Sequence, residues 1–333
     1  HAGAWFPNIR VDDPLVRGVA AQWREPPSPY GPLWSVVERV VVAGTGADPL
    51  LGVLGHRVVA LLGLVAIAWA VPRLARRCGV DPVRASWWGP AHPLALFHLV
   101  SAVHPEALML GLALVGLELA ARTGWARWIG VVALAAAAMI KVPMVVAVAF
   151  VGAQWAHRRG GRLRDAVVPA AVLLGTTAAV AALCAALVDA LGGRGWGWLD
   201  TLDTPGTVVT WMSLVSDTGL GLSVLTGRPE LLAAVRTVGL VVGSTCVLAL
   251  LLASLRGRRD AVAGTALGLG TVLLFSPVVQ PWYLLWALLP LVTTGAAPRW
   301  TPRLVLAAAV VALVDVPTGD WYFFRGFQLV LGV

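Results

Sequence analysis

The chain has 333 residues, of which 58% are hydrophobic and only 13% are charged, and its mean hydropathy is +0.80. A soluble domain carries roughly 45–50% apolar and about 25% charged residues, so this composition excludes a soluble enzyme, a nucleic-acid-binding protein and a disordered chain. It predicts an all-α polytopic membrane protein. The net charge of +8 then matters through its distribution along the chain.

Residues 1–49 are expected to form a large outer loop. Its Pro-rich segment WREPPSPYGPLW, residues 23–34, is followed by SVVERVVVAG, in which valines at helical spacing share one face. This pattern is typical of a short amphipathic helix that lies on the membrane surface. Because residue 1 is His and no signal-peptide pattern follows it, we expect a single transmembrane domain, 1–333, from which N-terminal spans are missing.

Ten apolar runs, bounded by arginine clusters, proline or glycine, are candidate membrane spans. They cover residues 50–72, 84–101, 105–121, 126–140, 143–157, 166–190, 231–255, 261–277, 282–297 and 303–316. The closely spaced pairs around 101–105 and 141–143 are either separate spans or re-entrant segments, so we expect about 8–10 transmembrane helices. Residues 192–230, rich in Trp, Gly and Asp, are expected to form a second outer loop.

Arginine alternates between the connections of these spans. If residues 1–49 lie outside, every second connection is cytoplasmic, and these connections hold 15 of the 25 basic residues. The fifteen are Arg73, Arg76, Arg77, Arg84, Arg122, Arg127, Arg158, Arg159, Arg162, Arg164, Arg256, Arg258, Arg259, Arg299 and Arg303. By the positive-inside rule, this predicts a multi-pass plasma-membrane protein. Because only the opposite connections are large, we expect its active site on the outer face.

An acidic pair, Asp12 and Asp13, precedes Pro14 in the first outer loop. Asp at the N-cap followed by Pro at the first helical position is a favoured pair, so Asp13 is a candidate helix cap. A carboxylate in an outer loop is also a candidate general base. Both interpretations stay open, because the two residues need not share a task.

Lys141 is the only lysine, and it follows an apolar run directly before Val142 and Pro143. A cation at the membrane boundary must be paired or reach water, which makes it a functional candidate. We expect it to bind a lipid phosphate, with Arg57 or Arg236 near the outer ends of their spans as further phosphate ligands. Alternatively, each of the three side chains simply extends to the membrane surface.

Two outer breaks carry polar and aromatic side chains. His104 and Glu106 flank a proline between two apolar runs, and they are either ordinary solvated residues or sugar contacts. No third ligand has a convincing spacing, so no metal site is predicted. The second break contains Gln280, Trp282 and Tyr283 between and after two prolines. These aromatic residues either belong to the interfacial belt or stack against a sugar ring.

Six motifs occur in a fixed order along residues 8–290. They are DDPL, WREPPSPYGPLW, HPLALFHLVSAVHPEALMLGLALVGL, MIKVP, TPGTVVTWMS and SPVVQPWYLLW. In this order they resemble the actinobacterial polyprenyl-phosphomannose-dependent α-(1→6)-mannosyltransferases, which act in lipomannan and lipoarabinomannan assembly. That resemblance implies a membrane glycosyltransferase of the GT-C class, whose first outer loop keeps an acidic pair, matched here by Asp12 and Asp13. Tyr30, in the second motif, joins the expected sugar- and acceptor-binding residues.

The resemblance implies an inverting transfer of mannose from polyprenyl-phosphate-mannose to a growing, lipid-linked α-(1→6)-mannan. A carboxylate base would take the proton of the acceptor hydroxyl, and cations would stabilise the leaving phosphate. No cofactor is certain, and the need for a divalent metal is left open. The expected partners are the lipid donor, the mannan acceptor and the bilayer, without nucleic acid.

Three alternatives are weighed against this reading. An α-(1→2)-mannosyltransferase or an arabinosyltransferase would use a similar lipid-linked donor. A secondary transporter would place charged groups near the centres of its spans, in two related halves. Here the span interiors are almost entirely Ala, Val, Leu and Gly. A structural membrane protein would need neither the acidic pair nor the single lysine.

Overall fold

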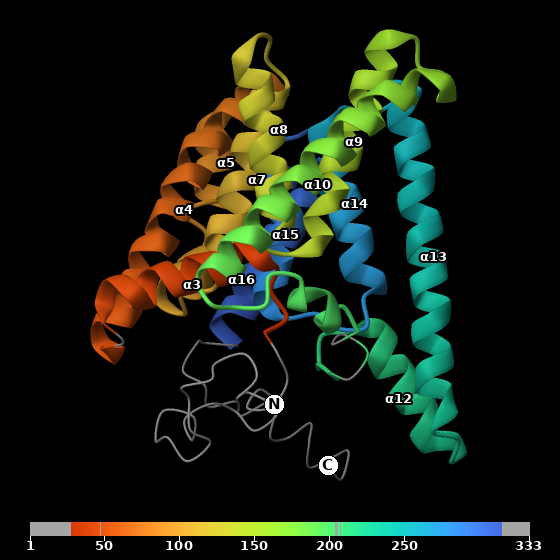
Figure 1. Ribbon diagram of the computed structural model, residues 1–333. Helices are drawn as coiled ribbons and strands as arrows, with labels where there is room; N and C mark the ends of the chain where they lie inside the picture. Colours follow the sequence, from red (N-terminus) through yellow and green to blue (C-terminus); the bar gives the residue numbers. More distant parts are fainter. Residues whose placement is uncertain (1–27, 47, 204–205, 207, 315–333) are drawn as a thin grey trace.

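The computed structural model describes residues 28–46, 48–203, 206 and 208–314, and all regular elements in this part of the chain are helices. Most of the long helices run between two ends of one bundle (Figure 1). The helices are α3 (Pro32–Thr45), α4 (Pro49–Arg77), α5 (Pro82–Trp88), α6 (Pro93–Ala95), η2 (Leu96–Ser101), α7 (Glu106–Ala120), α8 (Trp125–Ala138), η3 (Val142–Met144), α9 (Val145–Arg159), η4 (Leu163–Ala166), α10 (Val167–Ala190), η5 (Gly197–Thr201), α12 (Leu214–Thr226), α13 (Glu230–Leu255), α14 (Ala261–Phe275), η6 (Pro281–Tyr283), α15 (Leu284–Leu291) and α16 (Thr301–Val314). The predicted all-α membrane fold is confirmed.

Within the described residues, three helical segments are long and apolar enough to cross a membrane: α4, α13 and Leu163–Ala190, which includes α10. They coincide with the predicted spans 50–72, 231–255 and 166–190. Only 17%, 22% and 28% of their apolar stretches are buried, respectively. Helices satisfy their own backbone hydrogen bonds, so these exposed apolar faces suit contact with lipid.

Helices α4, α7 and α8 form a closely packed unit. At Gly63 of α4 a Cβ would collide with the backbone of Ala107, and at Gly130 of α8 it would collide with the backbone of Ala120. Small residues at such contacts let helix backbones approach closely. Because α7 and α8 are antiparallel, the start of α7 and the end of α8 lie at the same end of the bundle (Figure 1).

The predicted span 84–101 is broken into α5, α6 and the π-helix η2. Gly89-Pro90 and His92-Pro93 interrupt the apolar run, and proline cannot continue the backbone hydrogen bonds of a preceding helix. The His92 ring accepts a hydrogen bond from the Leu94 amide, and its other nitrogen lies 3.0 Å from the carbonyl of Val305 in α16. The run therefore crosses the bundle as consecutive short pieces.

The predicted amphipathic helix is present as α3, which lies across one end of the bundle against α4 and α10 (Figure 1). Trp34 near its start is buried, whereas Val40 is 58% exposed. The described part of the predicted outer loop 192–230 contains the short η5 and the helix α12.

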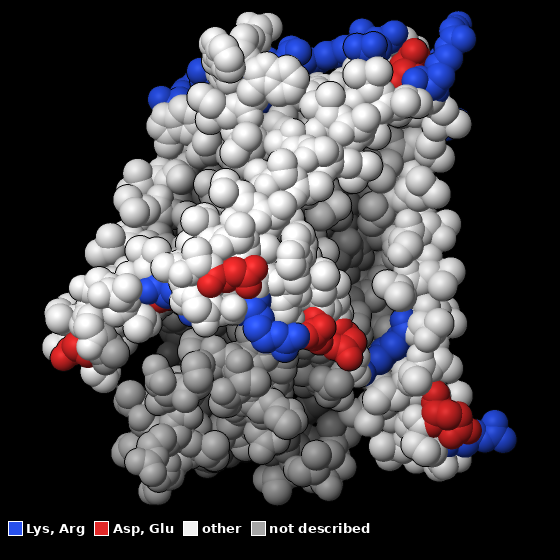
Figure 2. Space-filling model, in the orientation of Figure 1, with Lys and Arg blue, Asp and Glu red and all other residues white. Residues whose placement is uncertain are grey.

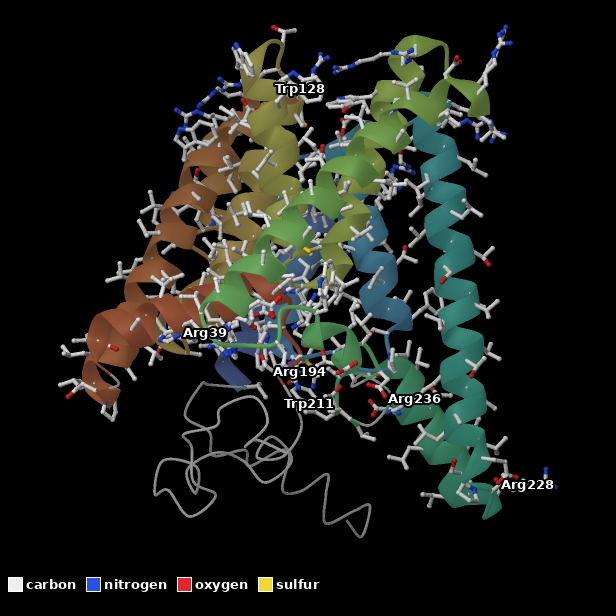
Figure 3. The ribbon with its side chains drawn as sticks, viewed as in Figure 1. Arg39, Trp128, Arg194, Trp211, Arg228 and Arg236 are labelled. Carbon is white, nitrogen blue, oxygen red and sulfur yellow. The ribbon has the colours of Figure 1, made fainter. Side chains whose placement is uncertain are left out.

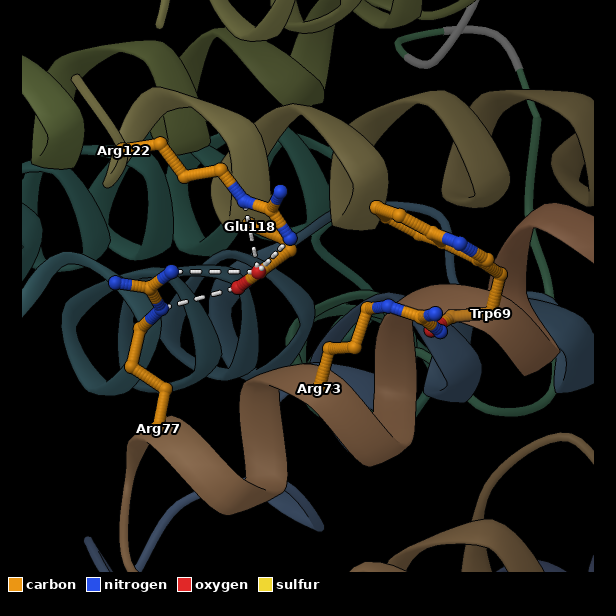
Figure 4. A network of polar contacts seen from close by, with 5 residues as sticks. All are labelled: Trp69, Arg73, Arg77, Glu118 and Arg122. Carbon is orange, nitrogen blue, oxygen red and sulfur yellow. Dashed lines mark hydrogen bonds and ion pairs between the residues drawn. The ribbon is translucent and has the colours of Figure 1, made fainter. Parts of the chain in front are cut away.

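The arginine-rich connections gather at the other end of the bundle, where Figure 2 shows a row of basic side chains. At this end Glu118 of α7 accepts hydrogen bonds from Arg77 and Arg122, with closest N–O distances of 3.0 and 2.8 Å (Figure 4). The Arg73 guanidinium lies 4.3 Å from the centre of the Trp69 ring. The bundle thus has one strongly basic end and one end of mixed charge.

Candidate functional site

The candidate site lies at the mixed-charge end, where α8 stops at Ala138. The backbone amides of Gly31 and Leu33 donate hydrogen bonds to the carbonyls of Ile140 and Met139. A Cβ at Gly31 would collide with the Met139 carbonyl, so this close approach requires glycine. The contact fixes the start of α3 against the end of α8.

Lys141 is the centre of the site and is 8% exposed. Its ammonium group donates hydrogen bonds to the Glu106 carboxylate and to the Tyr283 hydroxyl, both at 2.8 Å. The same nitrogen lies 4.0 Å from the centre of the Tyr283 ring, 5.0 Å from that of Tyr30 and 5.1 Å from that of Trp286. Ion pairing and surrounding aromatic rings together offset the cost of burying this charge.

Glu106 is fully buried in the first turn of α7. The amide groups at a helix N-terminus favour a negative charge there. One carboxylate oxygen binds Lys141, whereas the other has no hydrogen-bond partner among the described residues. The pair therefore retains hydrogen-bonding capacity that its protein partners do not use.

An aromatic wall adjoins the ion pair. The rings of His104 and Trp282 are stacked with their centres 3.7 Å apart, and His98 lies 5.6 Å from Trp282. His98 belongs to the π-helix η2, an element often found at functional sites. Val103, between the two histidines, has φ of +58°, which is a strained conformation for a β-branched residue. Such strain is concentrated at functional sites.

Six of the predicted site residues are thus brought together. They are Tyr30, His104, Glu106, Lys141, Trp282 and Tyr283. Sequence reasoning missed Trp286, whose ring stacks on that of Tyr283 with centres 4.1 Å apart. The spacing of three residues in WYLLW could have indicated it, because residues i and i+3 share a helix face.

Arg57, Arg236 and Gln280 have other contacts. Arg57 donates a hydrogen bond to the carbonyl of Ser101, at the end of η2. Arg236 of α13 binds the carbonyls of Gly206 and Val208 and the hydroxyl of Ser216, and Figure 3 places it beside α12. The Gln280 carbonyl accepts the amide of Tyr283.

Asp12 and Asp13 lie outside the described residues, and their roles as base and helix cap stay predictions. Within the described ranges, no group of three or more His, Cys, Asp or Glu residues could hold a metal ion. The described cluster is a buried ion pair surrounded by aromatic rings. Its aromatic faces can stack on an uncharged ring of a ligand, and its ammonium group can donate a hydrogen bond to a nearby anion.

Comparisons with known proteins agree along almost the whole chain. Residues 7–157 match a family model described as the N-terminal domain of α-(1→6)-mannopyranosyltransferase, and residues 209–333 match the MptB C-terminal domain. No solved structure matches the chain.

Curated proteins named α-(1→6)-mannopyranosyltransferase are similar to this chain over most of its length. A probable enzyme of this name from Mycolicibacterium smegmatis is 36% identical over 97% of this chain and 63% of its own length. One from Mycobacterium tuberculosis is 34% identical over 94% of this chain and 61% of its own length. A third, enzyme B from Corynebacterium glutamicum, is 31% identical over 94% of this chain and 54% of its own length. The chain thus spans 54–63% of the length of these relatives. With matches to both family models, it belongs to the α-(1→6)-mannopyranosyltransferase family.

Proposed function

We propose that this protein is a multi-pass glycosyltransferase of the plasma membrane. It transfers mannose from polyprenyl-phosphate-mannose to a growing, lipid-linked α-(1→6)-mannan, with inversion at the anomeric carbon. The names of the relatives support mannosyl transfer. The observation that carries the proposal is the buried Lys141–Glu106 pair with its aromatic surround, at the end of the bundle away from the arginine-rich connections.

The charge distribution supports an outer-face site. Basic connections favour the cytoplasmic side of a membrane. With the row of arginines in Figure 2 on that side, α3 and the start of α7 lie on the outer side. A lipid-linked sugar then reaches Lys141 from the membrane and the mannan reaches it from outside.

Lys141 keeps one donor for the substrate. An ammonium group has three N–H donors, and two of them point to Glu106 and Tyr283. The third can bind a phosphate oxygen of the donor while the pair stays intact. Arg57 is a second phosphate ligand in this proposal, because its Nε has no hydrogen-bond partner among the described residues. Arg236 is assigned the same role from its place near the outer end of α13.

The proposed reaction is one displacement. The acceptor oxygen bonds to the anomeric carbon of mannose as the bond from that carbon to the phosphate oxygen breaks. The acceptor proton passes to the carboxylate of Asp12, with Asp13 as helix cap, and the polyprenyl phosphate leaves as an anion. Tyr30, His104, Trp282 and Gln280 hold the sugars in this proposal.

The test is transfer by membranes that contain the chain, supplied with polyprenyl-phosphate-mannose and a short mannoside, with linkage analysis of the product. Lys141→Met should lower turnover by about 10²–10³, the usual effect of removing one group that stabilises developing negative charge. Lys141→Arg should keep part of the activity, because charge survives while geometry changes. Asp12→Asn should lower turnover by about 10²–10⁴, and Asp13→Asn by less.

Arg77→Gln is the matched control, because it also removes a cation from a buried carboxylate, at the opposite end of α7. It should leave turnover per folded molecule nearly unchanged. The proposal fails if the wild-type chain forms no α-(1→6)-linked product. The role of Lys141 fails if Lys141→Met retains wild-type donor kinetics.

A further inference from the structure

The motif TPGTVVTWMS, residues 204–213, has no task in the proposed reaction. It ends directly before α12, and its last described residues lie against the segment 276–279, which follows α14. That segment leads into η6, which carries Trp282 and Tyr283 of the candidate site. The motif therefore contacts the backbone that holds two aromatic side chains of the site.

Three buried hydroxyl groups connect the segment 276–279 to the motif and the start of α12. They belong to Thr210, Ser213 and Ser216, which are 4%, 0% and 0% exposed. Thr210 accepts a hydrogen bond of 3.0 Å from the amide of Val279. The two serines donate to the carbonyls of Ser276 and Pro277, at 2.8 and 2.6 Å respectively. We call these three residues the hydroxyl clamp.

The segment 276–279 needs such partners because of its prolines. In a continuing helix, the carbonyl of Pro277 would accept from the amide of residue 281, but Pro281 has no N–H. Ser216 supplies the missing donor. In membrane proteins, Ser and Thr side chains commonly satisfy backbone groups that a proline has freed. The clamp thus fixes the path of the chain where the helix is broken.

Arg236 of α13 supports the clamp from a third element. Its Nε donates a hydrogen bond of 2.9 Å to the Ser216 hydroxyl, and its two other nitrogens donate to the carbonyls of Gly206 and Val208, both at 2.7 Å. Figure 3 shows Arg236 beside α12 and α13. A guanidinium group has five N–H donors, so two remain for the phosphate role proposed above.

The clamp is separated from the Lys141 cluster by a single short turn. Val279, which the clamp holds, precedes Gln280, and the carbonyl of Gln280 accepts the amide of Tyr283 at 2.9 Å. The Tyr283 hydroxyl then accepts a hydrogen bond of 2.8 Å from Lys141, and its ring centre lies 4.0 Å from the same nitrogen. A shift of the backbone at Val279 is therefore passed to Lys141 through one turn of η6.

We propose that the hydroxyl clamp positions Tyr283, and through it Lys141, for transfer. Thr210, Ser213 and Ser216 act through the backbone of residues 276–279 and are positioning residues. This inference rests on the proposed mannosyl transfer and gives the motif TPGTVVTWMS a task in it. When the clamp is broken, the Tyr283 hydroxyl moves and the free N–H of Lys141 no longer points to the donor phosphate.

The first measurement is fluorine NMR of the purified chain labelled with fluorotyrosine. The signal of Tyr283 is identified by its loss in Tyr283→Phe. Thr210→Val keeps the shape of the side chain and removes the hydroxyl, so the Tyr283 signal should shift. Ser216→Ala breaks the bonds to Pro277 and Arg236 and should shift it as well. Thr210→Ser restores the hydroxyl and should keep the wild-type signal.

The second measurement is turnover per folded molecule in the transfer assay. Thr210→Val should lower turnover by about ten- to hundredfold, since a misplacement of about 1 Å can cost about 10²-fold in rate. Thr210→Ser should recover most of this loss. In a Tyr283→Phe background, Thr210→Val should have little further effect, because residues that act as one unit are not additive. A clamp that served stability alone would give additive effects.

Thr218→Val is the matched control. It makes the same substitution on α12, where the Thr218 hydroxyl is exposed and donates only within its own helix, to the Leu214 carbonyl. It should change neither the Tyr283 signal nor turnover.

An unmoved Tyr283 signal in both folded clamp variants would overturn the inference. A moved signal with wild-type turnover, or additive effects with Tyr283→Phe, would overturn the positioning role and leave the proposed function standing. A moved signal in the variants, without any transfer by the wild-type chain, would support the hold of the clamp on Tyr283 and refute the proposed function.

Discussion

Replacing Glu106 with glutamine tests whether the central ion pair holds the site together. The change keeps the shape of the side chain but leaves the Lys141 charge buried without its anion, since the side chains of the pair are 0% and 10% exposed. Breaking a buried pair in this way costs about 3–5 kcal/mol. At roughly 2 °C per kcal/mol for a large chain, the expected loss in Tm is about 6–10 °C.

Glu118→Gln is the comparison at the other end of the same helix. Its carboxylate is 4% exposed, but its partners Arg77 and Arg122 are 39% and 42% exposed. Water can solvate these arginines once the carboxylate is gone, so the expected cost is about 1–2 kcal/mol. The expected difference in stability loss between Glu106→Gln and Glu118→Gln therefore depends only on how exposed the partner cations are.

The assay is an SDS unfolding titration in mixed micelles, with thermal unfolding as a second measure. The double variant Glu106→Gln/Lys141→Met removes both charges and should lie within about 2 kcal/mol of the wild type, because neutral replacement of a whole buried pair costs little. A double variant that loses the full sum of the single effects would refute the reasoning. A Glu106→Gln variant whose free energy of unfolding falls by less than about 1 kcal/mol would also refute it.

Three other predictions follow from the fold. Gly31→Ala should cost about 1–3 kcal/mol and lower transfer, because its Cβ meets the Met139 carbonyl. Gly44→Ala, in open space near the end of α3, should instead be neutral or stabilise by up to about 1 kcal/mol in the same unfolding titration. Val103→Gly relieves the positive φ but also removes a partly buried side chain that packs against the core, so the net change in stability should stay within about 1 kcal/mol, and a loss of about 2 kcal/mol or more would contradict that strain. In a chain without its native cysteines, impermeant thiol reagents added outside sealed cells should label Leu225→Cys and spare Arg258→Cys, and the reverse result would invert the proposed orientation.

Local patterns were enough to predict the helices and their order. Apolar runs bounded by arginine and proline matched α4, α10 and α13, and valines at helical spacing matched α3. The alternation of arginine correctly placed its connections at one end. The break at residues 89–92 and the π-helix after it were missed, because hydropathy continues across Gly89-Pro90 and His92-Pro93, although the two prolines are a local signal for the break.

The sequence alone did not predict which side chains of the site contact one another. Lys141, Glu106 and Tyr283 were each singled out, but Lys141 was expected to bind a phosphate, and its partners lie 35 and 142 positions away. Only the tertiary fold, which brings the start of α7, the end of α8 and η6 together, places these side chains in contact. The role of Gly31 likewise depends on a backbone contact with Met139, for which no local pattern exists.

Two helices of similar apolar composition have opposite surroundings. In α7, 11 of 15 residues are buried, whereas in α13 only 4 of 26 are buried: Gly239, Gly243, Ser254 and Leu255. A position against lipid needs only to stay apolar, but a position between helices must also keep its volume. In a scan of all single substitutions, α13 should therefore accept most exchanges among Leu, Val, Ile and Ala, while α7 should reject most of them. Sequences that descend from a common ancestor would accordingly drift fastest along α13 and slowest along α7, although hydropathy alone rates the two helices alike.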